Sequence, residues 1–309
     1  MIVVERAPPY LTVQDIGRPG YRASGVPFGG AMDQWSLAMA NSLVGNPRSA
    51  AGLEWAIGGG AVRFEADATI AMWGADVEAS LDGSAVKTCQ RIRIPAGQTL
   101  AIQRIVGRRF VYLAVGGGVA SSPVLGSRST YLPAGMGGIE GRRLKTGDRI
   151  LTGKTNFTGE GGAPTIPDKI SPDFDSKEIR AIPADEDFES FAERIYKVSS
   201  ASDRMGYRME PDRPLEGLGA SITSEPVCAG AIQLPPNGEP IVLMADSPTV
   251  GGYRIIGTVI SCDMPILAQS LPGRSLKFAQ ISVATAQQEI RGRELWLAER
   301  FVRGESRRS

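Results

Sequence analysis

Short apolar runs separated by turn residues make up most of the chain between residues 53 and 150. The runs fall at residues 68–73, 92–94, 99–102 and 109–115. Turn sequences interrupt them, for example PAGQ at 95–98 and KTGD at 145–148. Many short strands at this spacing are typical of a closed or nearly closed β structure. We therefore predict a mainly β fold with a few short helices.

The rest of the pattern predicts further strands and the helices. Strands are expected at residues 2–5, 178–182, 240–246 and 275–283. One helix is expected after the N-cap Asp33, with Trp35 in the core, and it ends near Gly45. A second is expected at residues 185–197, where Phe188, Phe191, Ala192 and Ile195 share one face. Two more are expected at residues 264–271 and 289–302.

Residues 153–175 are rich in Gly, Pro, Thr and Asp, which favours a linker or a long exposed loop. A faint internal repeat lies on either side of it. Asp15 and the triplet GYR at 20–22 correspond to Asp203 and the triplet GYR at 206–208. The repeat predicts two related β domains, which we place at residues 1–160 and 175–309.

Composition excludes several classes of function. The 309 residues carry a net charge of +1, and basic residues concentrate only near the C-terminus, which argues against nucleic acid as a partner. The absence of histidine excludes Ser-His-Asp and Cys-His catalysis and histidine-bound zinc.

Three separated cysteines without CxxC spacing predict reduced, mostly buried thiols and no metal site. The first ten residues do not resemble a signal peptide, and no apolar run is long enough to span a bilayer, so a soluble cytoplasmic protein without a membrane partner is expected.

Two glycine-rich stretches are not phosphate-binding loops. The glycines at 116–118 lack GxGxxG spacing because position 121 is serine. The sequence GKT at 153–155 lacks the glycine that a P-loop needs five residues earlier, where Asp148 stands.

Asp246 ends the apolar run at residues 240–246 and precedes a Gly-Gly turn. A carboxylate at a strand end is well placed to meet a ligand. The same position also suits a residue that merely caps a turn. The sequence leaves both interpretations open.

The turn-rich motifs resemble those of one family. In the first half they are VQDIGRPGY at 13–21, GAMD at 30–33 and NSLVGN at 41–46. In the second half they are SDRMGYR at 202–208, GAIQ at 230–233 and GGY at 251–253. Together they resemble the carboxyltransferase or allophanate hydrolase subunit 2 family, which includes one of the 5-oxoprolinase subunits and the antagonist of a sporulation-kinase inhibitor. The similarity covers nearly the whole chain.

The resemblance implies two cyclophilin-like β-barrel domains and a heteromeric complex. The implied partners are a smaller subunit-1 protein, of the type found in 5-oxoprolinase, and a lactam-utilisation subunit. One departure is the pair Ala23-Ser24, where relatives often carry a histidine after the Gly-Tyr-Arg triplet. This chain must work without that imidazole.

The leading activity that the resemblance implies is ATP-dependent opening of 5-oxoproline to glutamate. The chain would be one subunit, inactive alone, and the complex would bind ATP with Mg²⁺. Arginines would stabilise negative charge or hold the substrate carboxylate, and aspartates would act as base or metal-nucleotide ligand. The candidate catalytic residues are Asp15, Arg18, Asp203, Arg204 and Asp246. The candidate substrate-binding residues are Tyr21, Tyr207, Gln233, Gly252 and Tyr253. A structural ion pair or loop contact is the alternative for each.

Two other activities stay open. One is biotin-dependent carboxyl transfer to urea or a similar amide, with biotin on another chain because this one has no Met-Lys-Met carrier motif. The other is a non-catalytic regulator that sequesters its partner. Neighbouring genes would discriminate: a lactam-utilisation subunit, a biotin carboxylase and a sensor kinase each favour a different activity.

Overall fold

The computed structural model describes residues 1–154, 170–215, 217 and 219–302. It divides into two compact units, each built on its own sheet. Of the described residues, the first unit contains 1–18, 29–154 and 297–302, and the second contains 19–28 and 170–296. The segment 19–28 thus belongs to the second unit, although the chain on both sides of it belongs to the first. The predicted domain boundaries, 1–160 and 175–309, remain a prediction.

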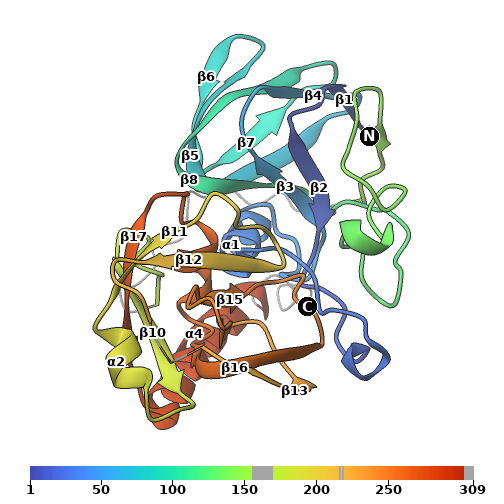
Figure 1. Cartoon of the computed structure of the whole chain (residues 1–309). Helices are drawn as coiled ribbons and strands as arrows, with labels where there is room; N and C mark the ends of the chain where they lie inside the picture. Colours follow the sequence, from blue (N-terminus) through green and yellow to red (C-terminus); the bar gives the residue numbers. More distant parts are fainter. Residues whose placement is uncertain (155–169, 216, 218, 303–309) are drawn as a thin grey trace. The chain divides into compact units, whose positions relative to one another are not determined.

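The first unit is a half-barrel formed by a nine-stranded sheet. Its main strand order is β2 (Tyr10–Gln14), β3 (Gly52–Ala56), β8 (Thr99–Val115), β4 (Gly60–Phe64), β1 (Ile2–Arg6) and β9 (Arg149–Ile150). The long strand β5 (Ala68–Leu81) pairs with β8, β6 (Ser84–Val86) and β7 (Arg91–Ile94). Figure 1 shows these strands in blue to green. The short 3₁₀ turn η2 (Leu132–Ala134) lies in the loop between β8 and β9.

Alternation along β2 and β3 gives the sheet one apolar face and one polar face. Leu11, Val13 and Trp55 are buried in the hydrophobic core. Their neighbours Thr12 and Glu54 point to the opposite face, because successive side chains of a strand alternate, yet they too are buried. The polar face of this sheet is therefore covered, and its polar groups need internal partners.

Helix α1 (Gln34–Leu43) forms where the sequence pattern predicted a helix, and it lies against β5 and β8. The side chain of Asp33 caps it by accepting from Ser36 N at 2.9 Å. Trp35 is buried, which confirms its assignment to the core.

The second unit contains a closed barrel. The order is β10 (Glu178–Pro183), β17 (Ser275–Gln280), β11 (Ile195–Val198), β12 (Gly206–Pro211), β15 (Ile241–Leu243), β14 (Ala231–Leu234), β16 (Val250–Val259) and β13 (Ser221–Pro226). An additional pairing of β10 with β16 joins the ends of the first seven strands into a ring, and β13 lies outside it on the edge of β16. An aromatic cluster packs helix α2 (Phe188–Ala192) on β11 and β17: the ring of Phe191 lies 4.9 Å from Tyr196 and 5.0 Å from Phe278, centroid to centroid.

Short helices complete the second unit: η1 (Arg22–Ser24), α2 (Phe188–Ala192) and α3 (Met264–Ala268). The C-terminal helix α4 (Val283–Val302) runs through residues of both units. The mainly β fold class is confirmed. Within the described residues, no helix is both long and apolar enough to cross a membrane.

The helix predicted at residues 185–197 is wrong in its second half. Helix α2 ends at Ala192, and Ile195–Val198 is strand β11. In this strand Tyr196 and Val198 are buried while Ile195 and Lys197 are exposed, a period of two. Ile195 therefore faces solvent rather than the shared helical face.

Other element boundaries also differ from the prediction. Strand β15 covers only Ile241–Leu243 of the run predicted at 240–246, and β17 ends at Gln280. The C-terminal helix begins at Val283, before the predicted residue 289.

The prediction of mostly buried thiols is wrong, because Cys89 and Cys228 are exposed and only Cys262 is buried; all three are free. Most of the predicted linker, residues 155–169, lies outside the described residues.

A salt bridge before β9 makes the stability of the first unit pH-dependent. Arg142 donates from Nη1 and Nη2 to the two carboxylate oxygens of Asp148 at 2.7 and 3.0 Å. These hydrogen bonds lower the pKa of Asp148. A carboxyl with a depressed folded pKa contributes stability above its unfolded pKa, about 4, and this contribution is lost as the pH falls through the folded value.

We therefore expect Asp148→Asn to flatten the pH dependence of stability. Between about pH 5 and pH 2, the free energy of unfolding should fall less in the variant than in the native protein. Urea titrations at several pH values measure this difference. Parallel profiles for the two proteins would contradict the assignment.

Candidate functional site

The carboxylate of Asp15 holds together two loops of the first unit. It follows β2 and is buried, with 6% of the residue exposed. Its oxygens accept from Ser127 Oγ at 2.6 Å, Ser129 Oγ at 2.5 Å, Arg128 N at 2.6 Å and Gly17 N at 2.8 Å. Asp15 thus joins the loop after β2 to residues 127–129.

Arg18 reaches the same loop. Its side chain is fully buried, and Nη2 donates to the carbonyl oxygen of Ser129. A Cβ at Gly137 would lie 2.0 Å from that same carbonyl oxygen and 3.1 Å from Arg18 Nη2, so only glycine fits beside this contact. The motif at 13–21 therefore supplies two charged side chains, Asp15 and Arg18, that both hold the loop at Ser129 in place.

The GAMD motif packs directly on this loop. Ala31 N donates to Asp15 O at 2.9 Å. Gly30 has φ +87°, and a Cβ there would lie 2.8 Å from Gly17 N. A side chain at position 30 would be excluded by both its φ and its neighbours. The motifs at 13–21 and 30–33 are thus parts of one structure.

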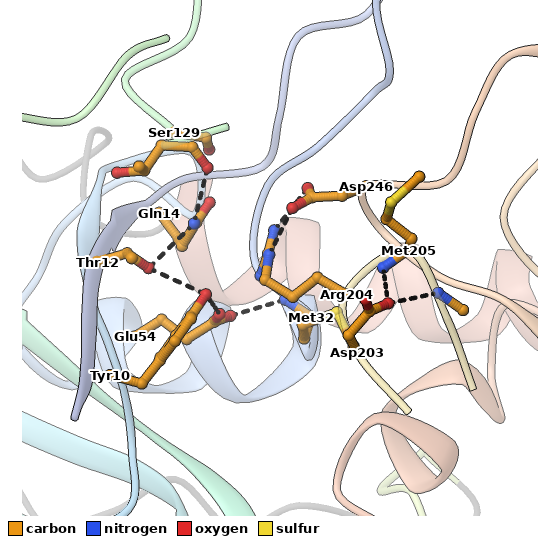
Figure 2. A network of polar contacts seen from close by, with 12 residues as sticks. Tyr10, Thr12, Gln14, Met32, Glu54, Ser129, Asp203, Arg204, Met205 and Asp246 are labelled. Carbon is orange, nitrogen blue, oxygen red and sulfur yellow. Dashed lines mark hydrogen bonds and ion pairs between the residues drawn. The ribbon is translucent and has the colours of Figure 1, made fainter. Parts of the chain in front are cut away.

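Sequence reasoning missed Glu54, the buried carboxylate at the centre of the polar face. Met32 N donates to Glu54 Oε2 at 2.8 Å, and Tyr10 Oη donates to Oε1 at 3.2 Å (Figure 2). Tyr112 Oη also donates to Oε2, at 2.8 Å. The pKa of Tyr112 is raised well above its ordinary value, first by burial and to a smaller extent by the negative charge of Glu54. The hydroxyl therefore stays protonated and donates. A charged residue between Leu53 and Trp55 in an apolar strand was the signal available in the sequence.

In the second unit, Arg204 and Asp246 form a buried ion pair. Arg204 Nε and Nη2 donate to the two oxygens of Asp246 at 2.8 and 2.9 Å, and 9% and 2% of the residues are exposed (Figure 2). The backbones are joined as well, because Asp246 N donates to Arg204 O at 2.9 Å. Asp246 stands just after β15, as predicted, and its carboxylate is engaged by Arg204.

Asp203 has a different role from its neighbour. Its Oδ1 accepts from Met205 N at 2.8 Å and Gly206 N at 3.2 Å, which shapes the turn into β12 (Figure 2). This local side-chain contact is an Asx turn. The structure therefore brings Arg204 and Asp246 together, and Asp203 stabilises the turn beside them.

The five candidate substrate-binding residues all lie in the second unit. Tyr207 is fully buried, and its hydroxyl donates to Ala268 O at 2.8 Å. Tyr21 and Tyr253 are exposed at 37% and 39%. Gln233 is buried on β14, and Gly252 on β16 has only ordinary contacts around the position of a Cβ. Tyr21 and Tyr253 are thus available to a ligand, whereas Tyr207 is engaged by the backbone.

Among the described residues, no group of three or more Cys, Asp or Glu side chains is placed to hold a metal ion. The two glycine-rich stretches pack on each other, since a Cβ at Gly117 would lie 2.3 Å from Gly153 O. Their glycines serve this close approach of two backbones, which supports the rejection of both as phosphate loops.

Comparison with known proteins connects these motifs to a family. The model of the carboxyltransferase domain, subdomains A and B, matches residues 24–280. The chain is 40% identical over 296 residues to one of the 5-oxoprolinase subunits of Escherichia coli, covering 93% of each protein. It is 32% identical over 311 residues to the urea amidolyase of Lachancea kluyveri, covering 90% of this chain but 17% of that protein. The crystal structure of the K. lactis urea amidolyase superposes with a TM-score of 0.86 at 26% identity, over 97% of this chain and 20% of that one.

Proposed function

The chain belongs to the carboxyltransferase family defined by subdomains A and B, and on that premise we propose that it is a subunit of a 5-oxoprolinase complex, which hydrolyses 5-oxoproline to glutamate. The observation that carries the proposal is the 40% identity to the E. coli 5-oxoprolinase subunit over 93% of both proteins. The similarity to urea amidolyase instead covers only 17% of that much longer enzyme.

ATP is the source of activation in this proposal, because the amide of a lactam is a poor electrophile and phosphorylation of its oxygen would activate it. The two glycine-rich stretches pack on each other at Gly117 and Gly153, and the carboxylates of Asp15 and Asp246 accept from donors of the chain itself. We therefore assign ATP and Mg²⁺ to another subunit of the complex. The partners proposed are a subunit-1 protein and a lactam-utilisation subunit, all in the cytoplasm.

The residues of this chain would bind and orient the lactam. In the second unit the ion pair between Arg204 and Asp246 fixes the backbone from which Asp203 and the turn into β12 extend. Tyr21 and Tyr253 are exposed and able to donate to a substrate oxygen. In the first unit Asp15 and Arg18 organise the loop at Ser129, which is the role that their contacts support.

The second candidate function is carboxyl transfer to urea or a related amide, with biotin on another chain. The observation that favours it is the 32% identity to a urea amidolyase over 90% of this chain. A third candidate, a regulator that sequesters its partner, predicts complex formation without turnover.

The proposal is tested by mixing this chain with its neighbouring gene products and measuring glutamate release from 5-oxoproline. We expect release that depends on ATP and on this chain, and no release from this chain alone. Arg204→Ala should abolish most of the activity, whereas Arg208→Ala, an exposed arginine four residues away, should leave it unchanged. A well-folded complex without ATP-dependent release would contradict the proposal. Urea with carboxybiotin would then be the substrate pair to test.

A further inference from the structure

The amide of Gln233 is a buried polar group whose nitrogen has no hydrogen-bond partner within the described residues. Only 5% of the residue is exposed. Burying an amide without a hydrogen bond is unfavourable, and most buried polar groups in proteins are paired. A group that folding leaves unsatisfied is suited to meet a ligand.

The surroundings of Gln233 are apolar. On β14 it pairs with Ile241 of β15 and Ile255 of β16. Both isoleucines pack on the small cluster formed by Val227, Ala231 and Leu243. A polar group set among apolar side chains is typical of small-molecule sites.

Glycine at position 251 makes room for this amide. A Cβ there would lie 2.1 Å from Gln233 Nε2 and 3.1 Å from Val227 Cγ1, so the amide would have to leave its present position. The GGY motif at 251–253 and the GAIQ motif at 230–233 therefore meet at the amide of Gln233. The spatial constraint falls on Gly251 rather than on Gly252, where a Cβ would have only contacts of 3.4 Å or more.

A positive charge lies at the same cluster. Arg22, from the segment 19–28 that belongs to the second unit, donates from Nη2 to the carbonyl oxygen of Val227. Val227 thus contacts the guanidinium through its backbone and approaches the Gly251 position beside the Gln233 amide through its side chain. One carboxamide and one guanidinium are brought to the same residue.

We propose that Gln233 is the specificity-determining residue for a cyclic amide, and that Arg22 pairs with a carboxylate on the same molecule. A lactam ring holds its amide in the cis form, so its N–H and C=O point to the same side. The carboxamide of glutamine presents an acceptor and a donor side by side and matches this pair with two hydrogen bonds. Rotation of the amide about its last side-chain torsion, which is soft, brings both atoms toward the ligand. This inference rests on the proposed 5-oxoprolinase function, because 5-oxoproline carries both groups.

The first test uses the reconstituted complex with Gln233→Leu, which keeps the volume and removes the amide. We expect KM for 5-oxoproline to rise roughly 10- to 100-fold, the effect of leaving buried polar groups unpaired, with KM for ATP unchanged. The melting temperature of the variant should stay equal or rise, since an unsatisfied amide is removed. Gln103→Leu, at an exposed glutamine of β8, is the matched control and should change neither KM. An unchanged KM for 5-oxoproline would overturn the proposal, whether or not the melting temperature falls.

A second test separates this inference from the proposed function. Binding of 5-oxoproline, 2-pyrrolidinone and proline to the complex is measured by calorimetry without ATP. The native protein should bind both lactams and prefer 5-oxoproline, Gln233→Leu should lose both, and Arg22→Gln should lose the preference. Lactam binding that depends on Gln233 in a complex without turnover would reject the proposed reaction but support the site. Equal binding of proline and 5-oxoproline, or no lactam binding at all, would reject the site.

Discussion

Replacing Asp246 with alanine is expected to lower the free energy of unfolding by about 3–5 kcal/mol, because it leaves Arg204 buried without its carboxylate. The two side chains share two hydrogen bonds of 2.8 and 2.9 Å and are almost fully excluded from solvent. A buried guanidinium that loses its counter-charge cannot be fully hydrated unless the turn before β12 opens. Urea denaturation followed by circular dichroism measures the loss.

The control variants separate the ion pair from the surrounding packing. Replacing both partners, as Arg204→Met with Asp246→Leu, should recover much of the stability, since two apolar side chains leave no buried charge. Arg208→Ala, at an exposed position on β12, should change the free energy by less than about 0.5 kcal/mol. A loss below about 1 kcal/mol in Asp246→Ala would show that water reaches the guanidinium and would contradict this description.

The second large effect is expected at Asp15 in the first unit. Asp15→Ala should lower the free energy of unfolding by about 3 kcal/mol or more, because four donors lose their acceptor. The loop at residues 127–129 should become accessible to hydrogen exchange at the same time. Thermal and urea unfolding of the purified variant give the magnitude.

Asp203→Ala is the matched comparison for Asp15, since the two aspartates occupy equivalent positions of the faint repeat. Asp203 accepts from only two backbone amides and is exposed, so its loss should be about 1 kcal/mol. Equal losses at the two positions would contradict the assignment of Asp15 as the organising residue of its loop. Asp15→Asn gives a further measure, because the amide keeps the size of the side chain and removes its charge.

Local signals in the sequence predicted much of the fold. Asp33 was identified as a helix cap because an aspartate precedes an apolar face with helical spacing, and the structure confirms that cap. The end of helix α2 at Ala192 was missed because the spacing of Phe188, Phe191 and Ile195 is compatible with two structures. It fits one continuous helix as well as it fits a helix followed by a strand. Pairing of β11 with β12 and β17 decides between them, and β17 is distant in the sequence.

The candidate site was predicted in its motifs but not in its contacts. Asp203 and Arg204 are neighbours in the sequence, yet Arg204 pairs with Asp246, 42 residues away. Glu54 was missed because its partners, Met32 N and the hydroxyls of Tyr10 and Tyr112, come from separate parts of the chain. Whether a charged side chain is satisfied depends on such partners, and a local pattern does not contain them.

The sequence by itself determined the mainly β class, the capped helix after Asp33 and the family, because turn residues, strand periodicity and ordered motifs are local properties of the chain. Only the tertiary structure decided that seven strands close into a barrel, that residues 19–28 join the second unit, and that Gly251 leaves room for the amide of Gln233. Strand closure and the burial of single polar groups arise from contacts between residues far apart in the sequence. Those contacts are fixed by packing of the whole unit, which no short stretch of residues specifies.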